Sequence, residues 1–536
     1  CGDTSLPFYD ALRTLDHGIE HILTRDERSA AYMADGYARV TGRVGVCEGP
    51  SGGGATYILP GLVEANESSV PVLAITTDVS RLSLGRYPLT ELDQGALFKP
   101  LTKWNAVIER SELVPRSVRS AFRAMTTGRP GSAHLAFPFD VQRAPVPESE
   151  LWAQEEHGSF PAWRTGPDPA AVERAVEAIL SAERPVVLCG GGVVLSRAEA
   201  ALERLVVRLN LPVTTTISGK GSLADTHPNC VGVVGSNGGV PATRAVLEGA
   251  DLVVMIGCRA GSVTTERWSC PRPGVRVVHI DADPMVISAS YRTEVAVVGD
   301  ALLALEAIDR VLDDNPPRRD FAGASLAARA REAKRRDFAE RSSSLDTPIR
   351  PERVARLLDK VLPRNSIVVA DPGTPCPYLS AFHDAEEPGR RFITNRAHGA
   401  LGYALAAALG AHYGRPSAKC VAVMGDGSFG FTSGELETVV RKELPITFIV
   451  LSNAVYGWIK AGQKAGFGER YFGVDFTRTD HAAVAQAFGL KSWRVEDPRE
   501  LETVLRSAVG SDGPALVDVI SQPLHEADAP VSEWIA

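Results

Sequence analysis

The sequence has no long apolar run and no excess of basic residues. Its longest apolar stretch, Ala400 to Ala411, is rich in glycine and alanine and falls well short of the roughly 20 residues that span a bilayer. We therefore expect no membrane segment. A net charge of −8 at pH 7 offers no basic face for phosphate backbones, which argues against a nucleic-acid partner.

Clustered cysteines and an initial methionine are also missing. The eight cysteines include no CxxC pair, and none has a histidine partner at metal-ligand spacing. Reduced thiols in a cytoplasmic protein are the simplest explanation. The chain opens at Cys1 in what has the composition of a turn. Because a strand and a helix usually precede such a turn, we expect an N-terminal piece to be missing.

What the sequence does contain is three segments of α/β pattern. With 536 residues it is too long for one core, and about three domains are expected. Short apolar runs alternate with helical patterns, which predicts doubly wound, Rossmann-like domains with mainly parallel sheets covered on both faces. We place these domains at residues 1–145, 165–313 and 345–536. A proline-rich linker and a charged helical stretch, Leu326 to Ser342, separate them.

The apolar runs predict the main strands and two helices of the three segments. The helices are expected at Ser29–Thr41 and Ala198–Leu209. The strands are expected at Ile19–Leu23, Val44–Glu48, Val70–Thr76, Pro185–Cys189, Val213–Thr216, Leu252–Ile256, Arg276–Ile280, Ser366–Asp371, Cys420–Met424 and Ile446–Leu451.

Asp426 and Asn453 each end an apolar strand of the third segment. In a parallel sheet both side chains would lie in the crevice at the carboxyl ends of the strands, where a carboxylate and an amide oxygen can ligate Mg²⁺. Gly425 and Gly427 would let the backbone approach a diphosphate, helped by N–H groups of a helix opening near Thr432. The alternative is a strand–turn–helix in which Gly-Asp-Gly serves as turn chemistry only.

The run from Met424 to Gly430, followed by Asn453 at this spacing, resembles the cofactor signature of thiamine-diphosphate enzymes. The resemblance covers essentially the full chain, in the order pyrimidine-binding, central and diphosphate-binding domain. It implies that Asp426, Asn453 and the backbone carbonyl of Val455 bind Mg²⁺. By the same resemblance, the residues that contact the cofactor are Gly373, Thr374, Gly399, Leu401, Gly425, Gly427, Ser428, Asn453, Tyr456 and Gly457.

Residues 25–39 resemble the acetolactate-synthase-type segment that bears the cofactor-activating glutamate, which makes Glu27 the catalytic candidate. The family usually has a histidine before this glutamate, where this chain has Asp26. Leu401 matches the bulky wedge that folds the cofactor into a V, and Gly399 matches a backbone acceptor for its 4′-amino group. Without the family resemblance, Glu27 would be interpreted as a carboxylate near a helix N-terminus, and Leu401 would be interpreted as an ordinary core leucine.

The resemblance also implies a substrate pocket, with Thr4, Gly53, Gly54 and Trp458 as its candidate lining. Trp458 is large where the family has a slimmer residue, and Gly462 stands in place of a pocket tryptophan. The acceptor pocket is therefore expected to differ in shape from that of the anabolic enzyme.

The implied reaction is thiamine-diphosphate-dependent decarboxylation of a 2-keto acid with carboligation to an acceptor, because the carbanion left by CO₂ needs the thiazolium as electron sink. One alternative is a 2-hydroxyacyl-CoA lyase or an oxalyl-CoA-type decarboxylase, suggested by Ser428 to Phe431. Others are a simple decarboxylase and a cofactor-binding protein without chemistry. FAD, an ADP group such as that of CoA, or nothing could occupy the central domain. The resemblance implies a homodimer at minimum, with a homotetramer common.

Overall fold

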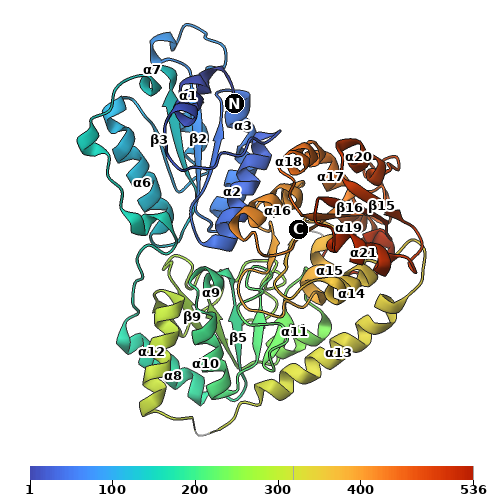
Figure 1. Cartoon of the computed structure of the whole chain (residues 1–536). Helices are drawn as coiled ribbons and strands as arrows, with labels where there is room; N and C mark the ends of the chain where they lie inside the picture. Colours follow the sequence, from blue (N-terminus) through green and yellow to red (C-terminus); the bar gives the residue numbers. More distant parts are fainter. Residues whose placement is uncertain (318, 535–536) are drawn as a thin grey trace. The chain divides into compact units, whose positions relative to one another are not determined.

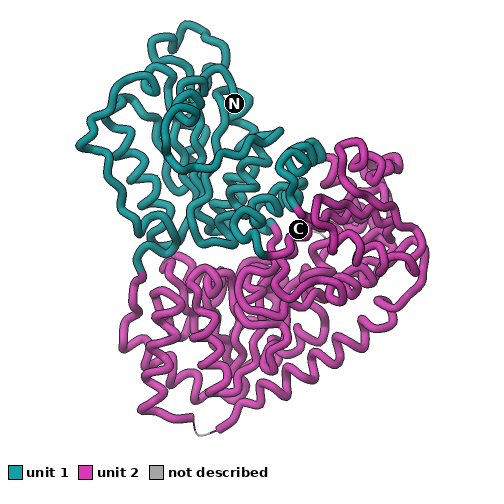
Figure 2. The backbone as a smooth tube through the Cα atoms, in the orientation of Figure 1, with its two compact units in different colours: residues 1–163, 395–417, 431–444 teal, residues 164–394, 418–430, 445–536 magenta. Residues whose placement is uncertain are grey.

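The computed structural model describes residues 1–317 and 319–534. Within these residues the strands form three sheets, and every pair of neighbouring strands is parallel (Figure 1). The backbone divides into two compact units (Figure 2). Unit 1 comprises residues 1–163, 395–417 and 431–444, and unit 2 comprises residues 164–394, 418–430 and 445–536. The predicted fold class is confirmed, and the domain limits that we placed remain predictions.

Unit 1 holds a four-stranded sheet in the order β1-β2-β4-β3. Its strands are β1 (Gly45–Gly49), β2 (Val72–Asp78), β3 (Trp104–Val107) and β4 (Ala133–Pro138). One apolar cluster around Leu62 and another around Leu135 cover the two faces, as expected for a parallel sheet. Its helices are α1 (Leu6–Thr14), α2 (Glu27–Thr41), α3 (Gly53–Tyr57), α4 (Leu59–Glu67), α5 (Gln94–Phe98), α6 (Val114–Thr126), α7 (Phe139–Gln142), α16 (Tyr403–Gly414) and α18 (Leu436–Arg441).

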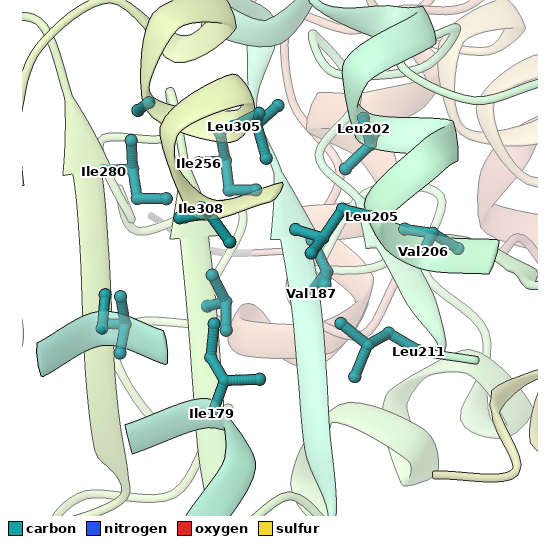
Figure 3. Close-up of a cluster of buried hydrophobic side chains, with 14 of the residues drawn as sticks. Ile179, Val187, Leu202, Leu205, Val206, Leu211, Ile256, Ile280, Leu305 and Ile308 are labelled. Carbon is teal, nitrogen blue, oxygen red and sulfur yellow. The ribbon is translucent and has the colours of Figure 1, made fainter. Parts of the chain in front are cut away.

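The second sheet, in unit 2, has the order β10-β9-β8-β5-β6-β7. Its largest core cluster joins Val187 and Ile256 of the sheet to Leu205 and Ile308 of the helices that cover it (Figure 3). Burying each such side chain contributes roughly 1.5–3 kcal/mol. The strands are β5 (Pro185–Cys189), β6 (Val213–Thr215), β7 (Cys230–Val233), β8 (Leu252–Ile256), β9 (Arg276–Asp281) and β10 (Val295–Val298), and the helices are α8 (Pro169–Ser181), α9 (Gly191–Leu195), α10 (Glu199–Leu209), α11 (Pro241–Glu248), α12 (Ala301–Asp314) and α13 (Gly323–Ser343).

The third sheet, also in unit 2, has the order β12-β11-β13-β14-β16-β15. The chain turns from β11 first to β12 on one side and then to β13 on the other, so the strand order reverses between β11 and β13, where α/β sheets bind ligands. The strands are β11 (Ile367–Ala370), β12 (Phe392–Thr394), β13 (Cys420–Gly425), β14 (Thr447–Ser452), β15 (Lys491–Val495) and β16 (Ala515–Ile520), and the helices are α14 (Pro351–Val361), α15 (Pro375–Phe382), α19 (Gly457–Phe467), α20 (His481–Phe488) and α21 (Leu501–Val509).

Two predicted elements are wrong. Residues 15–24 form no strand, because Ile19 and Leu23 are 64% and 44% exposed and have no neighbouring strand to pair with. The helix expected to open near Thr432 instead begins at Asp426 and ends at Thr432, as α17. The glycines of the Gly-Asp-Gly run therefore lie at the end of β13 and within the first turn of α17, and no separate loop precedes that helix.

The structure also bears on whether the chain has membrane segments and on the state of the cysteines. Among residues 1–317 and 319–534, no helix combines the length and apolarity needed to cross a bilayer. All eight cysteines are free thiols, and only Cys1 is exposed.

Candidate active site

Asp426 ties the ends of β13 and β14 together in unit 2. Its Oδ2 atom accepts the backbone N–H groups of Asn453 at 2.8 Å and Ala454 at 2.6 Å, and its Oδ1 atom accepts that of Gly427 at 2.9 Å. Burial raises the pKa of Asp426, and these three N–H groups oppose the rise. Asp426 and Asn453, two of the three residues predicted to hold the metal ion, are thus brought together at adjacent strand ends.

The loop after β14 offers further oxygen atoms. Its antiparallel bridge to residues 474–476 uses the N–H of Tyr456, which donates to Val474, and the carbonyl of Ala454, which accepts from Phe476. This pattern leaves the carbonyl of Val455 outside the bridge. The Nδ2 atom of Asn453 is buried without a hydrogen-bond partner in the described part of the chain. Because the amide can rotate by half a turn, this position can present an oxygen instead.

These atoms fit a Mg²⁺ site in their chemistry. One carboxylate, one side-chain amide and one backbone carbonyl are hard oxygen donors, and such a set suits an ion that shares its coordination with phosphate oxygens. No group of three His, Cys, Asp or Glu side chains suited to a metal occurs within 1–317 and 319–534. A phosphate-dependent Mg²⁺ site needs no such group.

Several other predicted cofactor residues gather around this loop. A Cβ atom on Gly427 would lie 2.8 Å from the ring of Tyr456, and one on Gly457 would lie 3.4 Å from the hydroxyl of Thr374. Gly373 has a φ of +93° and, like Gly425, has open space where a Cβ atom would be. Glycine is thus required at 427 and 373 for different reasons, close approach in one case and backbone conformation in the other. Ser428 is buried.

A cavity of about 170 Å³ borders Asp426, Asn453 and Val455. It is smaller than the roughly 300–1,000 Å³ that enclose a drug-sized ligand, so it can take only part of a cofactor. Basic side chains share its lining, namely Lys460, Arg478, Arg494, His481 and His525. Gly373, Thr374, Ser428 and Trp458 do not line it.

Trp458 lies on α19, half-buried, and its ring packs on that of Trp534 with centroids 5.1 Å apart. The carbonyl of Trp534 lies 3.2 Å from where a Cβ atom of Gly462 would be. The C-terminal segment therefore covers the helix face that Gly462 leaves without a side chain.

Glu27 is the first residue of α2 in unit 1, directly after Asp26, whose carboxylate caps the helix by accepting the N–H of Arg28 at 2.8 Å. A Cβ atom on Gly54 would lie 3.2 Å from Oε1 of Glu27, and one on Gly49 would lie 3.4 Å from its Cγ. The carboxyl group of Glu27 thus rests against the glycine loop at the end of β1, which the sequence had assigned to the substrate pocket.

Thr4 joins this loop through its hydroxyl, which bonds to Ser51 at 3.1 Å and Thr77 at 2.8 Å. Gly53 begins α3, and a Cβ atom on it would lie 3.8 Å from the ring of Tyr57. Leu401 and the exposed Gly399, with a φ of +71°, belong to unit 1 in the segment before α16. The structure thus divides the predicted cofactor residues between the two units.

Two carboxylates of unit 1 that contact its loops were not predicted from the sequence, the half-buried Glu48 and the buried Glu64. Glu48 accepts hydrogen bonds from Ser5 at 2.6 Å and Tyr9 at 2.8 Å at the end of β1. Glu64, on α4, is fully buried. The available signal was a charged residue inside an otherwise apolar run, in Val44–Glu48 and again around Leu62 and Ala65.

Comparison with known proteins identifies the class. Family models described as thiamine pyrophosphate (thiamine diphosphate) enzyme domains match residues 1–97 (N-terminal TPP binding domain), 172–308 (central domain) and 371–519 (C-terminal TPP binding domain). The chain therefore belongs to the thiamine pyrophosphate enzyme family, and it is a thiamine-diphosphate-dependent enzyme that catalyses carboligation.

Within this family the chain is similar to acetolactate synthase large subunits. It is 33% identical to a probable large subunit of Methanococcus aeolicus, over 97% of this chain and 88% of that protein. It is 32% identical to the isozyme 2 large subunit of Escherichia coli K12, over 97% of this chain and 91% of that protein. These relatives support the carboligase interpretation and give no support to the acyl-CoA lyase or oxalyl-CoA alternative.

Proposed function

We propose that the protein binds thiamine diphosphate with Mg²⁺ and uses it to decarboxylate a 2-keto acid and join the remaining acyl unit to an acceptor. The observation that carries the proposal is the bond between Asp426 and the backbone of Asn453, which fixes two oxygen-bearing side chains at adjacent strand ends. Asp426, Asn453 and the carbonyl of Val455 would hold the ion. Gly373, Thr374, Gly427 and Ser428 would border the diphosphate.

Bound thiamine diphosphate would supply the electron sink for the carbanion that loss of CO₂ leaves. Glu27 would donate a hydrogen bond to, and exchange a proton with, a ring nitrogen of the aminopyrimidine. The glycines at 49 and 54 support this role, because they let the side chain of Glu27 lie directly against the loop after β1. Leu401 would hold the two rings in the V shape, and the carbonyl of Gly399 would accept from the 4′-amino group.

We propose a homodimer as the minimum active unit, with a homotetramer as the larger assembly. In this arrangement Glu27 of one subunit serves a cofactor held by Asp426 of its partner. Unit 1 exposes large apolar side chains after β2: Leu82 is 82% exposed, Tyr87 96% and Leu89 86%. An apolar stretch of this kind is typical of a surface that another protein covers, which supports the assembly. The eight free thiols suit a cytoplasmic location.

The pocket for the acceptor would include Thr4, Gly53, Gly54 and Trp458. The relatives are named for acetolactate synthesis, so pyruvate is the first donor and the first acceptor to test. Trp458 and the packing of Trp534 beside Gly462 support an acceptor pocket with its own shape.

The decisive experiment is a substrate panel on protein reconstituted with thiamine diphosphate and Mg²⁺, with products identified by mass spectrometry. It contains pyruvate and longer 2-keto acids, alone and with aldehydes, beside 2-hydroxyacyl-CoA and oxalyl-CoA. We expect acetolactate or another hydroxyketone from the keto acids. Turnover of the CoA substrates alone would overturn the proposal.

The occupant of the central domain is settled on the same preparation. Flavin absorbance released on denaturation would identify FAD, and binding of CoA or ADP in calorimetry would identify an ADP group. If neither signal appeared, the central domain would be assigned a structural role.

A further inference from the structure

Glu64 binds the segment that carries Gly399 and Leu401. Its Oε1 atom accepts the backbone N–H of Arg396 at 3.2 Å, and its Oε2 atom accepts those of Ala397 at 3.1 Å and His398 at 2.7 Å. Glu64 lies on α4, more than 330 residues earlier in the chain, and both segments belong to unit 1 (Figure 2). Three consecutive N–H groups thus converge on one carboxylate.

The surroundings of Glu64 hold its carboxylate in place. It is fully buried, and its Oε1 atom also accepts from the Arg39 guanidinium at 3.1 Å and from the Ser68 hydroxyl at 2.6 Å. Arg39 in turn binds Asp35 at 2.7 Å, and Asp35 accepts the hydroxyl of Tyr403, the first residue of α16. A buried carboxylate with five donors is held in one orientation, since any rotation would leave several of them unpaired.

Further contacts hold the two ends of the same segment in place. The side-chain amide of Asn395 donates to the carbonyl of Ala400 at 2.6 Å, and Gly402 caps α16 with a φ of +84°. Helix α16 then lies directly on α2, the helix that Glu27 begins. A Cβ atom on Gly410 would fall 1.9 Å from the carbonyl oxygen of Met33, so the two helix backbones touch.

We propose that Glu64 is a positioning residue: its carboxylate sets the backbone of residues 396–398 and thereby the place of the Gly399 carbonyl and the Leu401 side chain at the cofactor. We call the bonds from the Glu64 carboxylate to the N–H groups of residues 396–398 the clamp. The catalytic consequence of the clamp rests on the proposed function, whereas the clamp itself does not. A carboxylate suits the task because it offers acceptors only, whereas an amide of the same shape would turn an NH₂ group toward backbone donors.

The clamp is tested by amide hydrogen exchange on the full-length protein, measured by mass spectrometry without cofactor. In the unaltered protein we expect the amides of 396–398 to be protected. Glu64→Gln should raise their exchange by about tenfold or more while peptides of the central domain stay unchanged. Unchanged protection at 396–398 would overturn the clamp whatever the reaction of the enzyme proves to be.

The positioning role is tested with thiamine diphosphate and Mg²⁺ bound, by the rate of hydrogen–deuterium exchange at C2 of the thiazolium. Glu64→Gln should slow this exchange by roughly tenfold to a hundredfold, because a displacement near 1 Å has effects of that size. Loss of amide protection with an unchanged C2 rate would show that the clamp supports the fold only, and would overturn the positioning role.

A burial-matched control separates positioning from general damage. Leu135→Ala removes a fully buried side chain elsewhere in the core of unit 1, so it should lower the melting temperature and spare the C2 rate. Equal slowing by Leu135→Ala would contradict the proposal. If Glu64→Gln does not fold, Glu64→Asp keeps the charge but shortens the reach, and intermediate amide protection with intermediate C2 slowing is expected.

Discussion

The carboxylate of Asp426 accepts the backbone N–H of Asn453 at 2.8 Å, across the ends of two neighbouring strands. The proposed metal ligands therefore hold one another in place through the backbone. Because Gly425 pairs with Leu451 in the sheet, the register of β13 and β14 decides where both side chains lie. The site is thus as rigid as the sheet from which it projects.

Replacing Asp426 by asparagine should abolish cofactor retention. The variant loses the negative charge and offers an NH₂ group toward two N–H donors, so we expect thiamine diphosphate affinity in the presence of Mg²⁺ to fall by at least about a hundredfold. Isothermal titration calorimetry measures it. Asp512→Asn, in an exposed loop of the same unit, is the control and should bind normally. Normal binding by Asp426→Asn would remove this residue from the metal site.

Glu27→Gln should bind the cofactor but activate it poorly. The amide keeps the size of the side chain and loses its exchangeable acid proton, so C2 exchange should slow by roughly 10²–10⁴. Nuclear magnetic resonance of acid-quenched samples follows the exchange. The exposed Glu20, changed to Gln, should exchange at the original rate. If Glu27→Gln behaved like this control, Glu27 would not be the activating residue.

The features that could be predicted from the sequence are those set by residues that lie close together in the chain. Strands β5 and β8 match their predicted limits because each is a short, continuous apolar run. The same rule failed at Ile19–Leu23, whose apolar residues have no strand beside them. Adjacency of Asp426 and Asn453 followed from the parallel-sheet rule. The link from Glu64 to residues 396–398 could not be predicted, because no local pattern specifies which distant backbone a buried carboxylate will contact.

Trp458→Leu should change the choice of acceptor more than the loss of CO₂. Removing the indole from α19 opens space beside Trp534, and pocket changes of this size shift selectivity by about 10- to 200-fold. Competing aldehydes and 2-keto acids, quantified together by mass spectrometry, report the shift. Trp152→Leu, at an exposed site in unit 1, should leave the product ratio as it was. An unaltered ratio in Trp458→Leu would place this residue outside the pocket.

Glu352→Gln should stabilise the protein in a pH-dependent manner. Glu352 is fully buried, neither of its carboxylate oxygens has a hydrogen-bond partner among the described residues, and Arg341 is no closer than 3.9 Å. Burial raises the pKa of Glu352 above its ordinary value of 4.5. Below that value the group is protonated in both states and the substitution should be neutral. As pH rises, the unfolded chain ionises first, so the native protein loses stability that the glutamine variant keeps.

By neutral pH the gain should reach roughly 1–3 kcal/mol, measured as the difference in chemical denaturation between the two proteins at pH 4 and pH 7. Glu340→Gln, exposed on α13, is the matched control and should show no such trend. A gain of equal size at both pH values would mean that packing, and not ionisation, is responsible.

The contact between α2 and α16 has a consequence for anyone who wishes to dissect or recombine this enzyme. Residues 403–411 are buried all around, and most of their contacts are with α2, in the first third of the chain. A fragment cut at residue 345 would carry α16 without its cover and would be expected to aggregate. Chimeras made from relatives should therefore take residues 395–417 and the N-terminal segment from the same parent. These two segments pack together in the structure although they are far apart in the sequence.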